Sequence, residues 1–411
     1  MKKIIHSARV SLGFKPEEVA AAAGWSRHRQ QEIEQSDDPF THELDRLTEL
    51  LGVNLEAMLL DGLTDPHPVA ALLKANAATL PAHARFSISE AMSVAREARA
   101  LERSLGYQHP MARLDEFKGN TTYTHPRDGA PERLALATRK KLRLGEEPIV
   151  SMGKLLDDLG VLVLWDRLPS DIDAFCFANE ELGGVIVGNL DGAHMKTAFG
   201  RRMAWAHELC HLLYDRAKMK TLKRFCQMEV QERGPSGPGL DENKLSMDDK
   251  IERRARAFGV YFLAPTAAIK SRWQEREGAV GDRVRGLMEE FGVGFEAIRW
   301  HLYNLNLLDR EAPLRGVPSF CPQQLEASDA VPPQLQSLMD GGVSPLRAGR
   351  LAELAREAVA ARIIAESRQR ELMKVPLHRW EKLRALLPST PTPAPAPGSL
   401  ATSSSLIGDW L

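Results

Sequence analysis

The spacing of apolar positions changes several times along the chain, and these changes predict its secondary structure. Residues 2–60 show short helical patterns broken near Pro16 and Gly24, which is typical of a compact all-helical module. After residue 131, short apolar runs typical of buried strands interrupt the helical patterns. The expected strands are 161–165, 174–177 and 185–187. We therefore expect an α+β, multidomain fold in which helices surround a small sheet.

Changes in composition divide the chain into five parts. We expect an all-helical module (1–62), a helical linker (63–131), a mixed α/β domain (132–315), a helical and basic region (316–387) and a tail (388–411). A Gly- and Pro-rich stretch within 216–247 predicts an insertion or mobile loop in the mixed domain. The tail is rich in Pro, Ser, Thr and Ala, so it is predicted to be disordered.

Bulk composition narrows the class of protein. Hydrophobic residues make up 43% and charged residues 27% of the chain, as in ordinary soluble globular proteins. The N-terminal sequence lacks the apolar run of a secretory signal, and no run of about eighteen apolar residues predicts a membrane span. The cysteines are too dispersed for a dense disulfide framework, which indicates a reducing compartment. We expect a cytoplasmic protein with no membrane partner.

The strongest chemical signal is an HExxH pattern formed by His207, Glu208 and His211. Residues four apart share one face of a helix, so both imidazoles can bind one Zn²⁺. Glu208 lies about 100° round the helix from His207, where its carboxylate can act as general base on an attacking water. Apolar residues flank the pattern, and a buried helix is a poor place for these polar side chains without a metal. The pattern therefore predicts a catalytic zinc site.

A catalytic zinc also needs a third protein ligand and an open position. Glu252 is the best candidate, although an i,i+4 ion pair with Arg256 on a surface helix is the alternative reading. If Glu252 is not the ligand, the next candidates are Glu229, Glu232 and Asp248. From the residues alone, the surface ion pair is the favoured reading of Glu252.

A second pattern follows the HExxH segment, with Glu252, Ala255, Phe258, Leu263 and Pro265 at the spacing E-x-x-A-N-x-F-A-x-x-L-L-x-P. The departures from it are Arg256, Gly259 and Phe262. On these two patterns, about residues 133–310 resemble the ImmA/IrrE family of zinc metallopeptidases. The resemblance implies a zincin-like domain in which His207, His211 and Glu252 bind zinc and Glu208 is the base.

Cysteine thiolates are strong zinc ligands, so a cysteine in the open position would keep such an enzyme latent. Cys176, in an expected strand, and Cys226, in the expected insertion, are candidates for this inhibitory fourth ligand. Plain buried cysteines are the alternative reading. The sequence does not identify an oxyanion stabiliser, and the candidates are Tyr214, Tyr261, Arg202 and His301.

The N-terminal module resembles the helix-turn-helix domain of the XRE family over about residues 6–60, through Pro16 to Ala20, Gly24 to Arg27, Ile33-Glu34 and Leu50 to Val53. The resemblance makes Ser26 to Gln35 the recognition helix, with four candidates for DNA contact: Arg27, Arg29, Gln30 and Gln31. Residues 1–62 nevertheless hold seven Lys and Arg against eleven Asp and Glu, which handicaps binding to phosphates. Dimerisation and substrate docking are alternative roles.

The family resemblance implies a zinc-dependent endopeptidase that cleaves a partner transcriptional repressor, itself XRE-like, and so derepresses a stress, phage or defence operon. The alternative is a DNA-binding transcriptional regulator whose peptidase-like domain is sensory. Residues 341–385 hold ten Lys and Arg against five Asp and Glu, so this segment is a candidate nucleic-acid face or simply a solvated basic helix. Expected partners are the protein substrate, nucleic acid as operator or activator, and a second copy in a homodimer.

Overall fold

The computed structural model describes residues 2–36, 41–53, 69, 72–73, 76, 78–107, 113–117, 129–219, 246–309 and 323–384. The expected tail (388–411), most of the expected insertion, and the candidates Cys226, Glu229 and Glu232 lie outside these ranges. Among the described helices, none combines the length and the apolar character needed to cross a bilayer.

The N-terminal module begins the chain with four described helices. They are α1 (Lys2–Ser11), α2 (Pro16–Ala23), α3 (Arg27–Gln35) and α4 (Thr41–Leu51). Gly24 ends α2 with a φ of 79°, a left-handed conformation that glycine adopts without strain. Ser26 caps α3, since its hydroxyl accepts a hydrogen bond from the backbone nitrogen of Arg29 at 3.1 Å. These two residues produce the tight turn between α2 and α3.

Three strands form a mixed sheet: β1 (Leu162–Asp166), β2 (Ala174–Asn179) and β3 (Gly183–Asn189). β3 lies in the middle, parallel to β1 and antiparallel to β2. The predicted strands are all present, with small differences at their ends. Every residue of β3 is buried, because helices cover both faces of the sheet.

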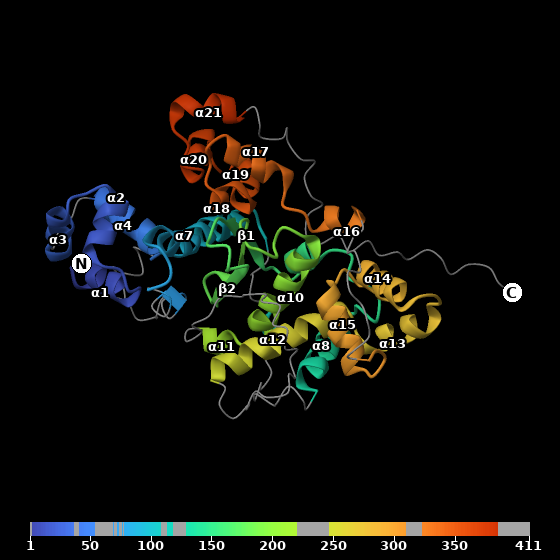
Figure 1. Cartoon of the computed structure of the whole chain (residues 1–411). Coiled ribbons are helices and arrows are strands. Elements are labelled where there is room, and N and C mark those ends of the chain that lie inside the picture. Colours follow the sequence, from blue (N-terminus) through green and yellow to red (C-terminus); the bar gives the residue numbers. More distant parts are fainter. Residues whose placement is uncertain are drawn as a thin grey trace.

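Helices fill the rest of the mixed domain. The described ones are η1 (Asp115–Phe117), α8 (Ala130–Lys141), α9 (Met152–Asp158), α10 (Ala198–Tyr214), α11 (Arg216–Met219), α12 (Met247–Leu263), α13 (Thr266–Glu275), α14 (Val280–Phe291) and α15 (Phe295–Asn304). α10 packs between the sheet and α12, and α8 packs against α12 (Figure 1). This arrangement makes α10 the central helix of the domain. Together with the sheet, it confirms a mostly helical chain with a small mixed sheet.

Alternate strand residues point to opposite faces of the sheet, and each face belongs to a different core. Trp165 and Ile186 pack in the core that contains α10. Leu164, Phe177 and Val187 pack on the other face, in a core that also contains the apolar residues of the N-terminal module. The sheet therefore separates the surroundings of α10 from a core shared with the N-terminal helices.

Helix α7 (Ala82–Ser104) lies within residues 63–131, the segment expected to be a helical linker. Thirteen of its 23 residues are buried. It packs against both α4 and β1, and Phe86 of α7 stacks on Phe14 of the N-terminal module with ring centroids 4.2 Å apart. α7 is therefore a layer of the fold, and it joins the N-terminal module to the sheet.

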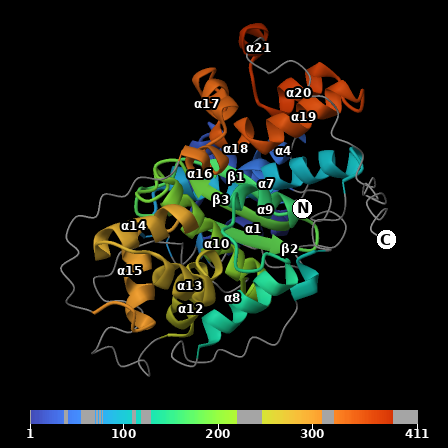
Figure 2. The same ribbon diagram turned by 90° about the vertical axis from the view of Figure 1, so that its right-hand side faces the viewer.

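The C-terminal region contains α16 (Gln323–Ser328), α17 (Pro333–Asp340), α18 (Pro345–Ala348), α19 (Arg350–Ala360), α20 (Glu366–Leu372) and α21 (Leu377–Arg384). α18 contacts β1, and α19 packs along α7. Figures 1 and 2 both show α17–α21 gathered on the side of the sheet away from α8 and α12. The C-terminal helices thus complete the second face of the sheet.

The close approach of β3 and α10 predicts a strong effect of one added methyl group. A Cβ on Gly188 would lie 2.4 Å from the Trp205 ring and 3.0 Å from Met195. We expect Gly188→Ala to lower the free energy of unfolding by about 1–3 kcal/mol, measured by urea denaturation. The matched control is Gly153→Ala in α9, where the nearest contact of the new Cβ is 3.7 Å. Equal stability of the two variants would contradict this account of the interface.

Candidate metal centre

Helix α10 carries the HExxH pattern through the middle of the domain. Thr197 caps its N-terminus by accepting a hydrogen bond from the backbone nitrogen of Gly200 at 3.1 Å. The helix is apolar on most of its surface, which is typical of a buried helix. His207, Glu208 and His211 are respectively 1%, 2% and 3% exposed. Three polar side chains in such a position need partners for their nitrogen and oxygen atoms.

Helix α12 supplies one of those partners, because it places the Glu252 carboxylate against both imidazoles. Oε2 of Glu252 lies 3.1 Å from Nε2 of His207, and Oε1 lies 3.4 Å from Nε2 of His211. The two Nε2 atoms are 3.0 Å apart. The structure therefore brings the three predicted ligands together. Asp248, the alternative ligand one turn earlier on α12, does not belong to this group of three side chains.

The donor set fits a zinc ion. In a tetrahedral site with bonds of about 2.0–2.1 Å, neighbouring donor atoms are about 3.3 Å apart. The observed separations of 3.0–3.4 Å are close to that value. His211 donates from Nδ1 to Asp215 Oδ2 at 3.0 Å, so its Nε2 carries a lone pair aimed at the other donors in the neutral tautomer. A cation between the three groups would relieve the repulsion of these lone pairs.

The electrostatics of the site also favour a cation. Burial disfavours the charged form of His211, but the carboxylates of Glu252 and Asp215 outweigh it and raise its pKa well above the usual range. Burial acts to raise the pKa of Glu252, yet the nearby imidazoles lower it below the usual range. Glu252 is therefore held as a carboxylate that stabilises positive charge beside it.

Asp215 is a site residue that the sequence analysis missed. It is fully buried, and besides His211 it accepts a hydrogen bond from Arg254 of α12. A carboxylate behind a metal-binding imidazole fixes its orientation and tautomer. The spacing of four between His211 and Asp215 was the available signal, because it puts both on one helix face. Arg254 gave no such signal, since its role depends on how α12 packs against α10.

Cys176 and Arg202, two further candidates from the sequence, have defined surroundings in the structure. Cys176 does not belong to the group of potential ligands, so the described structure does not support it as an inhibitory fourth ligand. Its sulfur lies 3.8 Å from the backbone oxygen of Glu208, and burial together with nearby carboxylates raises its pKa well above the usual value. Arg202 is not an available oxyanion stabiliser, because it forms a fully buried ion pair with Asp329 at 2.6 Å.

The remaining candidates for the oxyanion stabiliser, Tyr214, Tyr261 and His301, contact other residues of the mixed domain. The Tyr214 hydroxyl lies 2.7 Å from Oγ1 of Thr138. His301 and Tyr261 pack edge to face with ring centroids 5.0 Å apart, and burial lowers the pKa of His301 to about 4. None of these contacts involves the three candidate ligands.

The DNA-contact candidates of α3 have partners within the N-terminal module. Gln30 is fully buried and donates to Glu34 at 3.0 Å, so its side chain faces the interior of the module in this conformation. Arg27 forms an ion pair with Glu17 at 3.0 Å, and Arg29 bonds to Glu32 and Glu43. Gln31 is exposed. The basic side chains of α3 are therefore largely neutralised by the acidic residues around them.

The role of Asp215 generates a test of the metal centre. We expect Asp215→Asn to weaken zinc affinity by about 10- to 100-fold, because an amide holds His211 less firmly in the ligand tautomer. The affinity is measured by competition with a chelating indicator on the full chain. The control is Asp158→Asn, which changes an exposed carboxylate paired with Lys154. Zinc affinity equal to wild type in Asp215→Asn would contradict the assigned role.

One part of the chain matches a known protein family. The family model described as the IrrE N-terminal-like domain, a peptidase family, matches residues 157–303. The match contains the sheet, α10 and α12, and it leaves out the N-terminal module, α8 and all helices from α16 onwards. No curated protein and no solved structure matches the chain. Residues 157–303 are thus a metallopeptidase-type domain, as the resemblance to the ImmA/IrrE family predicts.

Proposed function

We propose that the chain is a cytoplasmic zinc-dependent endopeptidase that makes a limited cut in a partner transcriptional repressor. The observation that carries the proposal is the buried group of His207, His211 and Glu252. The buried Glu208 directly follows His207 on α10. The match to a metallopeptidase-type domain over the same elements supports it.

The residues of the site have distinct roles in this proposal. His207, His211 and Glu252 would hold the ion, which supplies Lewis acidity and lowers the pKa of water. Asp215 keeps Nε2 of His211 directed at the other donors. The carboxylate of Glu208 takes the proton of the attacking water and passes it to the leaving amine.

The burial of the site favours limited cleavage. The two imidazoles and the Glu208 carboxylate are almost fully buried, so a substrate segment must be held in a defined position to reach them. Such a site suits one recognised partner better than general digestion. A repressor with an XRE-like fold is the proposed substrate, since the resembling family acts on such proteins and about residues 6–60 of this chain resemble a module of the same kind.

The base provides the direct test of peptidase activity. We expect Glu208→Gln to reduce cleavage of the repressor by about 10²- to 10⁴-fold while zinc stays bound, because glutamine cannot accept the proton. Cleavage is followed by mass spectrometry of candidate repressors mixed with the zinc-loaded chain. Glu371→Gln, which alters an exposed ion pair with Arg368, is the control. Full cleavage by Glu208→Gln would contradict the proposed mechanism, and no defined cut in any repressor would contradict the proposed function.

A DNA-binding regulator with a sensory peptidase-like domain is the second candidate, and the capped helix α3 after a tight turn favours it. This candidate predicts a tight, sequence-specific gel shift with the protein's own upstream DNA. It also predicts unchanged regulation of that promoter by Glu208→Gln. The peptidase proposal predicts that Glu208→Gln abolishes derepression, so a reporter assay with this variant separates the two functions.

A further inference from the structure

The C-terminal region lies outside the matched domain but contacts its central helix. Asp329, directly after α16, forms the fully buried ion pair with Arg202 of α10. The same carboxylate accepts hydrogen bonds from Ser151 Oγ at 3.0 Å and from the backbone nitrogen of Gly153 at 2.9 Å. One side chain therefore ties the start of α9 to the helix that carries the zinc ligands.

Glu326 of α16 adds to the contacts of Asp329 with α10, and we call these two residues the near anchor. It bonds to Arg201 of α10 at 2.5 Å and accepts from the backbone nitrogen of Ala198, in the first turn of α10, at 3.2 Å. Arg201 also donates to the backbone oxygen of Asp329 at 2.7 Å. A buried cation that loses its partner is strongly destabilising, so α10 cannot shift without α16. The position of residues 326–329 thus helps to set the position of His207 and His211.

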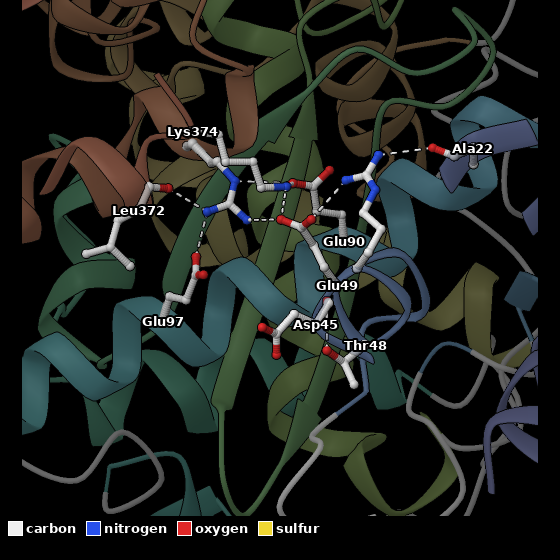
Figure 3. A network of polar contacts seen from close by, with 10 residues as sticks. Ala22, Asp45, Thr48, Glu49, Glu90, Glu97, Leu372 and Lys374 are labelled. Carbon is white, nitrogen blue, oxygen red and sulfur yellow. Dashed lines mark hydrogen bonds and ion pairs between the residues drawn. The ribbon is translucent and has the colours of Figure 1, made fainter. Parts of the chain in front are cut away.

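The other end of the region holds the N-terminal module. Figure 3 shows Glu49 of α4 and Glu90 and Glu97 of α7 close to Lys374, and we call this group, with Arg347, the far anchor. The buried guanidinium of Arg347 in α18 pairs with the same three carboxylates. Arg347 bonds to Glu97 and Glu90 of α7 at 2.7 and 3.2 Å and to Glu49 of α4 at 3.4 Å. It also donates to the backbone oxygen of Leu372 at 2.5 Å. Lys374 forms ion pairs with both Glu49 and Glu90.

Glu49 is the carboxylate of the far anchor that can be removed without leaving a buried cation unpaired. The three carboxylates pair with Arg347 and Lys374, and Glu49 also pairs with the partly exposed Arg46 of α4 at 2.9 Å. Without Glu49, the two carboxylates of α7 balance Arg347 and Lys374. Removal of Glu49 therefore leaves a neutral set within α7 and the C-terminal region. It removes the ion pairs between α4 and that region without stranding a buried charge, because the Arg46 side chain is partly exposed.

A short packed segment joins the two anchors. α17 places Leu335 and Leu338 in the core that contains α10. Leu346 lies in the core shared with the N-terminal module, two residues before Ala348 in the α10 core. A segment fixed in both cores transmits a displacement at one end to the other, since packed interiors do not absorb it.

We propose that residues 323–384 form a brace that positions α10 and couples the zinc site to the docking of α4. Through Glu326 and Asp329 the brace holds the ligand helix, and through Arg347 and Lys374 it holds the N-terminal module. This inference rests on the proposed function, because it assigns the regulation of the same site. A partner that moves the N-terminal module would thereby change how firmly zinc is held.

The test compares three variants of the full zinc-loaded chain. We expect zinc transfer to a chelator to be about 10-fold faster in Asp329→Asn and about threefold faster in Glu49→Gln. Hydrogen exchange within 198–214 should rise in both. The matched control is Glu34→Gln, which breaks the buried ion pair with Arg9 inside the N-terminal module but contacts neither anchor. It should leave both measurements unchanged, and urea denaturation of each variant checks that it is folded.

Glu49→Gln decides the outcome, because Glu49 is partly exposed and its loss leaves no unpaired buried cation. Wild-type zinc transfer and wild-type exchange of α10 in this variant would overturn the brace. An equal effect in Glu34→Gln would also overturn it, since general weakening of the module would then be sufficient. Both readouts need no substrate, so a failure to find cleavage does not affect them. If the chain binds no zinc, the proposed function fails and hydrogen exchange alone decides on the brace.

Discussion

The rest of the structure depends on one constraint, which is that helix α10 carries five buried charged or polar side chains along its length. Each of them needs a partner, because an unpaired polar group in a core is costly. Helix α12 supplies a partner for the imidazoles through Glu252 and a partner for Asp215 through Arg254. The C-terminal region supplies partners for the two arginines. The positions of α12 and α16 around α10 follow from this requirement.

The zinc ligands and the structural ion pairs on α10 therefore form one arrangement. Its C-terminal half is fixed by Asp215 and Arg254, and its N-terminal half by Glu326 and Asp329. Held at both ends, the helix presents its two imidazoles in one orientation. This is the preorganisation that a catalytic metal site needs. It also explains why a region beyond the peptidase-type domain is part of the same folded unit.

Local patterns were sufficient to predict much of this from the sequence. Apolar runs located the three strands, and a spacing of four located His207 and His211 on one helix face. Glu252 was selected through a family pattern, because the residues alone favoured an ion pair on the surface. Asp215 left a readable spacing. Asp329 and Arg347 left none, since an acid and an arginine in a polar stretch resemble surface residues until packing buries them. The role of α7 was missed for a similar reason, because its mixture of Ala, Arg and Glu resembles a solvated helix.

The central claim is that the buried group of two imidazoles and a carboxylate is a zinc site completed by Glu252. Native mass spectrometry of the purified full chain, compared with Glu252→Ala, tests it most directly. The account predicts one zinc ion per wild-type chain and a large loss of zinc from the variant. Wild-type protein without zinc, or a variant that retains zinc as firmly as wild type, would contradict it.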